Sequence, residues 1–155
     1  MKAASSAKPI TILIADDDAD DRLMIRDALE ENRLANDVRF VENGEELMAY
    51  LLRQEKYSSA ENSPRPGLIL LDLNMPKMDG REALREIKNN PAIRGIPVVV
   101  LTTSKAEEDI YRTYHLGVNS FITKPVTFDS LVSITKDLGR YWFEIVELPS
   151  ERPSR

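Results

Sequence analysis

The chain has 155 residues and no cysteine, so it can bury a core as one domain without disulfide bonds. Its net charge of −5, from 21 basic and 26 acidic side chains, argues against direct nucleic-acid binding, which needs a basic surface. The N-terminal "MKAASSAKPI" lacks the apolar part of a secretory signal, and no apolar stretch approaches the ~18 residues of a membrane span, so we expect a cytoplasmic protein without a membrane anchor.

Short apolar, β-branched segments alternate with longer amphipathic segments, a pattern that predicts βαβ units and a parallel sheet. We expect strands at residues 10–15, 38–41, 68–73, 96–102 and 120–123. The first, third and fourth are apolar nearly throughout, as in strands covered on both faces. The second alternates apolar and charged residues, so we expect it near an edge of the sheet.

Amphipathic segments predict helices near residues 20–32, from 43 onward, from about 83 to Pro91, 104–117 and 127–146. The fourth is expected to open with a capping box of Ser104 and Glu107 and to end at Gly117. A chain of this kind fits a doubly wound (βα)5 sandwich, flavodoxin-like, with a five-stranded parallel sheet of order 2-1-3-4-5. Ligands bind such sheets beyond the carboxyl ends of strands one and three.

The chain is expected to divide into three parts. Residues 1–9 form a flexible N-terminal segment, residues 10–140 the folded domain, and residues 141–155 an extension of the fifth helix with a polar tail. Within the domain, "SSAENSPRPG" at residues 58–67 is interpreted as a tolerated surface insertion between the second helix and the third strand.

Carboxylates follow two of the predicted strands. The first strand ends in "IADDDADD", which contains Asp16 and Asp17, and the third ends at Asp72. In the predicted sheet these three side chains meet at one edge, where they would repel one another unless a divalent cation lies between them. An all-oxygen ligand set suits Mg²⁺. We expect Asp17 and Asp72 to bind it directly, Asp16 through water, and the carbonyl of Asn74 to complete the protein ligands.

The fourth and fifth strands end in a hydroxyl and a cation. Thr102 is suited to contact a phosphoryl oxygen, and Lys124 supplies a positive charge. These groups fit phosphoryl transfer to Asp72 as nucleophile, with a metal and a lysine stabilising the transition state. Taken alone, "DDDADD" is more typical of a solvated, acidic helix start, and only the joint placement of the four strand ends indicates a site.

With these residues at its strand ends, the sequence resembles a response-regulator receiver domain of two-component signalling, over residues 10 to about 140. The motifs that carry the resemblance are "ILIADDD", "LLDLNMPKMDG", "VVVLTTS" and "SFITKP", the last with a proline that is typically cis in that family. The resemblance implies the following roles: phosphorylation at Asp72, an acidic pair at Asp16 and Asp17, a switch hydroxyl at Thr102, the family's lysine at Lys124, and an aromatic switch at Phe121. It also implies a phosphoacceptor that catalyses only its own phosphorylation and dephosphorylation, rather than an enzyme with a separate substrate.

Within receivers, the residue 58–67 insertion and the C-terminal "YWFEIVELP" are similar to the single-domain regulators that partner phytochrome-type histidine kinases. Few residues follow the fifth helix, so we expect no output domain and a signal passed through protein contacts. Two positions depart from the commonest receiver pattern. Thr103 stands where Ala or Gly is frequent, and Phe121 lacks the hydroxyl of the often-seen tyrosine.

A second apolar stripe on the fifth helix predicts a homodimer. Val132, Gly139, Phe143 and Val146 fall together on a helical wheel, and Gly139 would allow close approach of a second helix. We expect the dimer to form through the fourth helix, the fifth strand and the fifth helix. The alternative is that this stripe covers the domain's own fourth helix or frays in solvent.

Three other functions are compatible with parts of the pattern. A Mg²⁺-dependent phosphohydrolase of the haloacid-dehalogenase type also uses an aspartyl nucleophile, but it carries a second acid where this chain has Asn74. A flavodoxin-like flavin binder would need a phosphate-cradling loop in place of "ADDDADD". A receiver that serves only as a binding scaffold, without phosphorylation, remains the third alternative.

Overall fold

The computed structural model describes residues 10–31, 37–103, 106–125 and 127–140. Along the chain the elements are β1 (Thr11–Ala15), α1 (Ala19–Glu31), β2 (Asp37–Val41), α2 (Gly44–Leu51), the 3₁₀ turn η2 (Glu55–Tyr57), β3 (Leu68–Leu71), α3 (Gly80–Asn89), β4 (Val98–Thr102), α4 (Glu107–Leu116), β5 (Ser120–Thr123) and α5 (Phe128–Gly139). The strands pair in parallel in the order β2-β1-β3-β4-β5, which confirms the predicted flavodoxin-like α/β sandwich.

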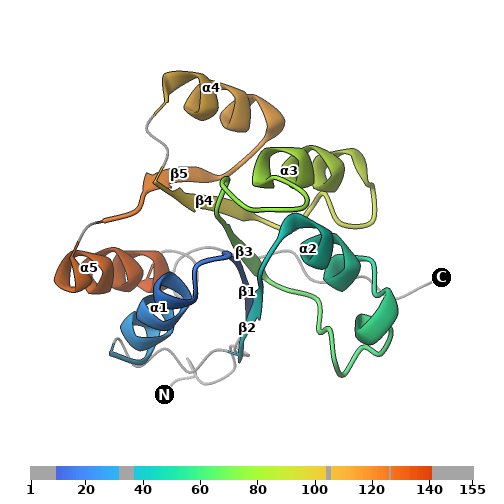
Figure 1. Ribbon diagram of the computed structural model, residues 1–155, viewed down its shortest axis with the longest axis horizontal. Helices are drawn as coiled ribbons and strands as arrows, with labels where there is room; N and C mark the ends of the chain where they lie inside the picture. Colours follow the sequence, from blue (N-terminus) through green and yellow to red (C-terminus); the bar gives the residue numbers. More distant parts are fainter. Residues whose placement is uncertain (1–9, 32–36, 104–105, 126, 141–155) are drawn as a thin grey trace, which may run out of the picture.

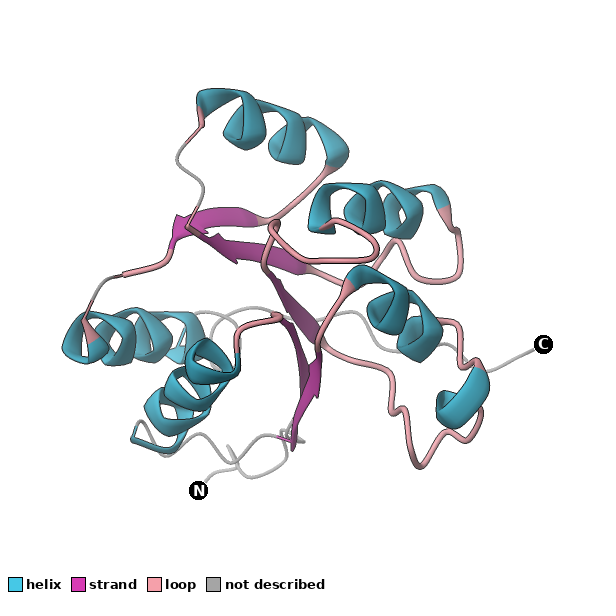
Figure 2. Cartoon of the chain, in the orientation of Figure 1, coloured by secondary structure: helices cyan, strands magenta, loops and turns pink. Residues whose placement is uncertain are grey.

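Helices cover both faces of the sheet. Figure 1 shows α1 and α5 together on one face and α2, α3 and α4 on the other. Figure 2 shows the strands as the central layer between the helices. The acidic segment after β1 lies at the carboxyl edge of the sheet, where the loop after β3 also begins.

The period-2 alternation of the strands divides the core into two layers. In β1, Leu13 and Ala15 belong to the core under α2 and α3, whereas Ile12 and Ile14 belong to the core under α1 and α5. All residues of β3 and β4 are buried, as expected for strands covered on both faces. β2 is only partly buried and lies at an edge, which confirms its predicted position.

Three strands are shorter than predicted, β1 by one residue and β3 and β4 by two residues each. β3 ends at Leu71, although the N–H of the next residue, Asp72, still bonds the carbonyl of Ala15 at 3.0 Å. β4 begins at Val98 instead of residue 96, after Pro97, which has no N–H to donate to a ladder.

The cap predicted for the fourth helix is wrong, although its end is confirmed. α4 begins after Ala106, which offers no side-chain cap, so Glu107 is the first helical residue and not the partner of a box with Ser104; Ser104 itself lies outside the described residues. At the other end Gly117 takes a left-handed conformation, φ 105°, that favours glycine.

The connection from α2 to β3 contains η2, which the sequence pattern did not predict, and it is anchored at two points. The hydroxyl of Tyr50 donates to the carbonyl of Pro64 at 2.8 Å, and the buried Ser63 donates to the carbonyls of Tyr57 and Ser59. The rest of residues 58–62 is exposed. No helix among the described residues has the length and apolar character needed to cross a membrane.

Candidate functional site

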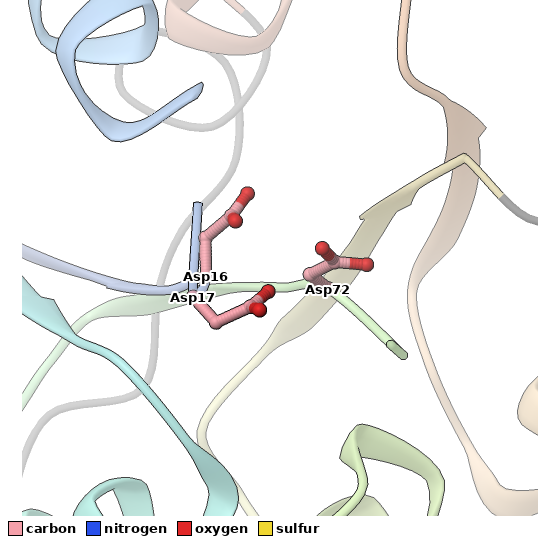
Figure 3. A group of neighbouring side chains, drawn as sticks. All are labelled: Asp16, Asp17 and Asp72. Atoms are coloured by element: carbon pink, nitrogen blue, oxygen red, sulfur yellow. The ribbon is translucent and has the colours of Figure 1, made fainter. Parts of the chain in front are cut away.

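The neighbouring strands β1 and β3 bring three carboxylates to one place. Ala15 pairs with Leu71 in the parallel ladder, so the next residues, Asp16 and Asp72, emerge side by side although 56 positions separate them in the sequence. Figure 3 shows Asp16, Asp17 and Asp72 beyond the ends of these strands. One carboxylate oxygen from each residue lies within 4.8 Å of the other two, which confirms the predicted clustering of these side chains.

The acidic run after β1 divides its side chains between different tasks. Asp18 caps α1, because its Oδ1 accepts from the N–H groups of Asp20 at 2.8 Å and Asp21 at 3.1 Å. Asp16 is buried and accepts from the N–H of Asp18 at 2.9 Å. Asp17 is exposed. The dipole interpretation of "DDDADD" therefore applies to part of the run, while Asp16 and Asp17 belong to the cluster.

Lys124 is the cation of the site. It follows β5, and its N–H bonds the carbonyl of Thr102 at 2.8 Å, which fixes the end of β5 against β4. Its Nζ lies 2.7 Å from Asp16 Oδ2, 2.7 Å from Asp21 Oδ2 and 3.0 Å from Asp72 Oδ2. The side chain is only 10% exposed, so these are partly buried ion pairs and not screened surface contacts.

Asp72 is held on both carboxylate oxygens. The hydroxyl of the buried Thr102 donates to Oδ1 at 2.7 Å, and the N–H of Asn74 donates to the same oxygen at 3.2 Å. Oδ2 accepts from Lys124. Thr102 and Lys124 therefore lie beside Asp72, and together with the N–H of Asn74 they hold its carboxylate in one orientation.

Burial and the ion pairs of this site shift the pKa values of Asp16 and Lys124. Burial raises the pKa of Asp16 above its usual value, although the hydrogen bond from Lys124 opposes the shift. Burial alone lowers the pKa of Lys124, but its hydrogen bonds to Asp16 and Asp21 outweigh that effect, and the net pKa is raised. The lysine is therefore a permanent ammonium at neutral pH, set among more negative charge than it neutralises.

The donor set fits a hard divalent cation. Asp16, Asp17 and Asp72 offer carboxylate oxygens, and no nitrogen or sulfur ligand takes part among the described residues, which favours Mg²⁺ or Mn²⁺ over softer metals. The exposed Asp17 leaves the cluster open to water on one side, as a partly hydrated ion requires. The N–H of Asn74 bonds Asp72, so the backbone of Asn74 lies next to this cluster.

Phe121 lies in β5, half-buried against the core below α2, α3 and α4. Its N–H donates to the hydroxyl of Tyr114 in α4 at 3.1 Å. A tyrosine hydroxyl is thus present at the α4–β5 contact, although it comes from α4 and not from the position of Phe121. The peptide bond between Lys124 and Pro125 is trans, in contrast to the cis bond that the resemblance implied.

The predicted dimer stripe is only partly described. Phe143 and Val146 lie outside the described residues. Gly139 is buried and borders a small apolar cavity with Ile25 and Leu29 of α1, and Val132 packs against the same core layer. Gly139 therefore lies buried beside α1 within the described domain, and the predicted approach of a second copy stays a prediction.

Sequence reasoning missed Asp21 and Arg81. Asp21 lies four residues before Ile25 and seven before Ala28, on the buried stripe of α1, and an acid on such a stripe is a usable signal. Arg81 binds Asp109 of α4 through Nε at 2.6 Å and Nη2 at 2.7 Å, and its Nη1 contacts Asp79. Arg81 lies in the first turn of α3 and links α3 and its N-cap Asp79 to α4. Its contact with Asp109 joins residues 28 positions apart, so no local sequence pattern indicates it.

Comparison with known proteins agrees with this geometry. The family model of the response regulator receiver domain matches residues 12–136. The response regulator Rcp1 of Synechocystis sp. is 42% identical over 150 residues, which cover 97% of this chain and 99% of Rcp1.

Solved structures show the same likeness. The phosphorylated cyanobacterial phytochrome response regulator RcpA is 43% identical, with a TM-score of 0.86 over 92% of this chain and 100% of that structure. The Mn²⁺-bound form of Rcp1 has a TM-score of 0.84 at 42% identity, over 92% of this chain and 100% of that structure. With its parallel sheet, its acidic cluster and its lysine in place, the chain belongs to the response regulator receiver family.

Proposed function

We propose that this response regulator accepts a phosphoryl group from a histidine kinase on Asp72 and signals through protein contacts of the receiver. One observation carries the proposal: Thr102 and Lys124 hold the two oxygens of Asp72 at 2.7 and 3.0 Å, beside the acidic pair Asp16 and Asp17. A carboxylate placed in this way has a fixed orientation and a cation beside it, and it lies next to two further carboxylates that can bind a metal. The receiver domain is proposed to run over residues 10–140, with the remaining residues as flanking segments.

In the proposed reaction, an oxygen of Asp72 attacks the phosphorus of a phosphohistidine. The new O–P bond forms as the N–P bond breaks, and the histidine nitrogen keeps the bonding electron pair. Charge on the equatorial oxygens is stabilised by the ammonium of Lys124, which already lies 3.0 Å from Asp72. Hydrolysis of the acyl phosphate by water returns the carboxylate, so the protein catalyses only its own phosphorylation and dephosphorylation.

We infer that Mg²⁺ is the resident metal, held by Asp16, Asp17, Asp72 and the carbonyl of Asn74. When bound, the ion supplies charge neutralisation for the carboxylates and for the phosphoryl oxygens. The similar regulator Rcp1 has a solved form that is bound to Mn²⁺, which is consistent with a set of oxygen donors. In this chain the donors converge within 4.8 Å, a spacing that one small cation can bridge.

The signal is proposed to leave the site through Thr102. On phosphorylation its hydroxyl turns from the Asp72 carboxylate to the phosphoryl group, and Phe121 turns inward into the vacated space. Because the N–H of Phe121 bonds Tyr114 in α4, this movement changes the α4–β5 surface. Partners that read this surface would distinguish the two states.

The partner is proposed to be a phytochrome-type histidine kinase, since RcpA and RtBRR, two similar proteins of known structure, are response regulators of phytochromes. We further propose a cytoplasmic protein that forms a homodimer through α4, β5 and α5, extended by residues 141–148. Because Gly139 and Val132 pack inside the domain, the apolar contacts of that dimer would come from Phe143, Val146 and the exposed side of α4. No direct contact with nucleic acid is part of the proposal.

Phosphotransfer tests the proposal. The wild-type chain, incubated with a radiolabelled phytochrome-type kinase and Mg²⁺, should take up the label, and chelation of the metal should prevent it. Asp72→Asn should remain unlabelled although the rest of the site is intact. Labelling of Asp72→Asn at the wild-type rate would contradict the assignment.

A further inference from the structure

One of the three acidic residues that contact Lys124 does not belong to the metal cluster. Asp21, in the first turn of α1, accepts from Lys124 Nζ at 2.7 Å, a distance equal to that of Asp16 and shorter than that of Asp72. The two residues are 103 positions apart, and the contact joins α1 to the end of β5. The Asp21 carboxylate is 27% exposed, so this is a partly buried pair.

The ammonium of Lys124 has three N–H groups, and three carboxylates surround it. An incoming phosphoryl oxygen therefore needs one of these donors to be released. Asp72 changes partners because it becomes the acyl phosphate, and Asp16 belongs to the carboxylate group that fits a metal. Asp21 is outside that group, so its contact with Lys124 can persist through the reaction.

The side of the lysine that faces α1 offers no other polar partner among the described residues. A small cavity there, of about 20 Å³, is lined by Asp21, Lys124 and the apolar side chains of Met24, Ile25, Leu101, Pro125 and Leu131. These apolar neighbours cover one side of the pair, which is partly exposed elsewhere, and so strengthen its electrostatic attraction. Without Asp21, the ammonium would have no counter-charge on this side and would be free to take other rotamers.

We propose that Asp21 is a positioning residue, which anchors the ammonium of Lys124 in line with the phosphoryl group while Asp16 and Asp72 engage the metal and the phosphorus. The inference rests on the proposed function of Asp72 as phosphoacceptor. It assigns the acidic start of α1 a task beyond its interaction with the helix dipole. Asp21 makes no bond to the reacting atoms and acts only through Lys124.

Asp20 provides a matched control. It is the preceding residue in the same turn of α1, it has the same charge, and its side chain is exposed, with no contact to Lys124 within the described chain. Asp20→Asn and Asp21→Asn remove equal charge from the first turn and weaken the same dipole interaction. Any difference between them therefore reports the contact with Lys124.

The experiment uses the full chain with acetyl phosphate, which needs no kinase docking, at saturating Mg²⁺. We expect Asp21→Asn to be phosphorylated roughly tenfold more slowly than Asp20→Asn, since misplacing a catalytic group by about 1 Å is costly. The Mg²⁺ dissociation constant should match between the two variants, whereas Asp21→Asn should have the lower melting temperature, because only it loses an ion pair with Lys124. If Asp21 only supported the fold, Asp21→Asn would lower the melting temperature but would leave the phosphorylation rate at saturating Mg²⁺ equal to that of Asp20→Asn.

Equal phosphorylation rates for the two variants would overturn the inference, because the contact with Lys124 would then have no effect on the reaction. A faster Asp21→Asn would also overturn it, because Asp21 would then only compete with the phosphoryl group for Lys124. In that case the wild type would still be phosphorylated on Asp72, and the proposed function would stand. A wild type that is not phosphorylated, or an Asp72→Asn variant that is, would overturn both.

Discussion

Replacing Lys124 by Met should destabilise the metal-free protein at neutral pH. The substitution keeps most of the side-chain volume but removes the only ammonium that contacts Asp16, Asp21 and Asp72 within the described chain. Two of these carboxylates, Asp16 and Asp72, are buried. No ammonium group among the described residues would then offset the repulsion between these carboxylates.

The size of the effect follows from the geometry. Two unit charges within 4.8 Å repel by at least about 3 kcal/mol at an effective dielectric constant of about 20. Removing one partner of a buried ion pair costs about 3–5 kcal/mol, and the open side near Asp17 places this site at the lower end. A loss of about 3 kcal/mol corresponds to a fall in melting temperature of roughly 6–12 °C for a chain of this length.

The pH dependence has a definite sign. The raised pKa of Lys124 means that its contribution is fully present below the unfolded value of 10.5 and is lost only as pH rises through the higher folded value. The raised pKa of Asp16 means that the folded state takes up a proton more readily than the unfolded state, so Asp16 disfavours folding above that pKa. The deficit of Lys124→Met should therefore shrink as pH falls and Asp16 becomes neutral.

Urea unfolding in EDTA at pH 7.5 and at pH 5 measures this deficit, and exposed Lys136→Met on α5 serves as the control. We expect a large loss for Lys124→Met at pH 7.5, a smaller one at pH 5, and partial recovery in millimolar Mg²⁺. If Lys124→Met were as stable as Lys136→Met in EDTA at pH 7.5, the electrostatic reasoning would be refuted.

Three further predictions concern the metal, the loop after β3 and the dimer. Mg²⁺ at ten times its dissociation constant should stabilise the fold by about 1.4 kcal/mol, and calorimetry should find a smaller shift for Asp17→Asn; an equal shift would place the metal elsewhere. Gly80→Ala should lose about 1–3 kcal/mol in urea unfolding, because its Cβ would lie 2.3 Å from the Asp72 carbonyl oxygen and 2.7 Å from Leu73 Cα, whereas Gly95→Ala, with open space around its Cβ, should stay near wild type. Similar losses for the two glycines would argue against this steric account. Light scattering should show a homodimer for the full chain at tens of micromolar and a monomer for Phe143→Asp; a monomeric wild type would disprove the proposed interface.

Much of the fold could be predicted because the sequence signals are local. Apolar runs in β1, β3 and β4 identify strands buried on both faces, and alternating strand and helix patterns leave few topologies open. The site residues follow from the same logic, since parallel strands that are neighbours in the sheet place their ends together. Asp16, Asp72, Thr102 and Lys124 all lie directly after a strand or at its last residue.

Contacts that depend on how helices cross the sheet could not be predicted in the same way. The sequence can place Asp21 on the inner stripe of α1, but its contact with Lys124 depends on how α1 packs beside α5, which no local pattern specifies. The predicted cap of α4 was wrong because spacing alone does not fix where a helix begins. Ser104 and Glu107 have the spacing of a capping box, but the helix begins three residues after Ser104. Gly139 was assigned to an outer face, whereas it is buried and borders a cavity shared with residues of α1.

The central claim, that Asp72 is the phosphoacceptor, is tested most directly by locating the acyl phosphate. After phosphorylation with acetyl phosphate and Mg²⁺, borohydride reduces an aspartyl phosphate to homoserine, and peptide mass spectrometry identifies the converted position. The account predicts homoserine at residue 72 and unchanged aspartate at residues 16, 17 and 21. Homoserine at any of those three positions, or none at residue 72 in protein that carries phosphate, would contradict it.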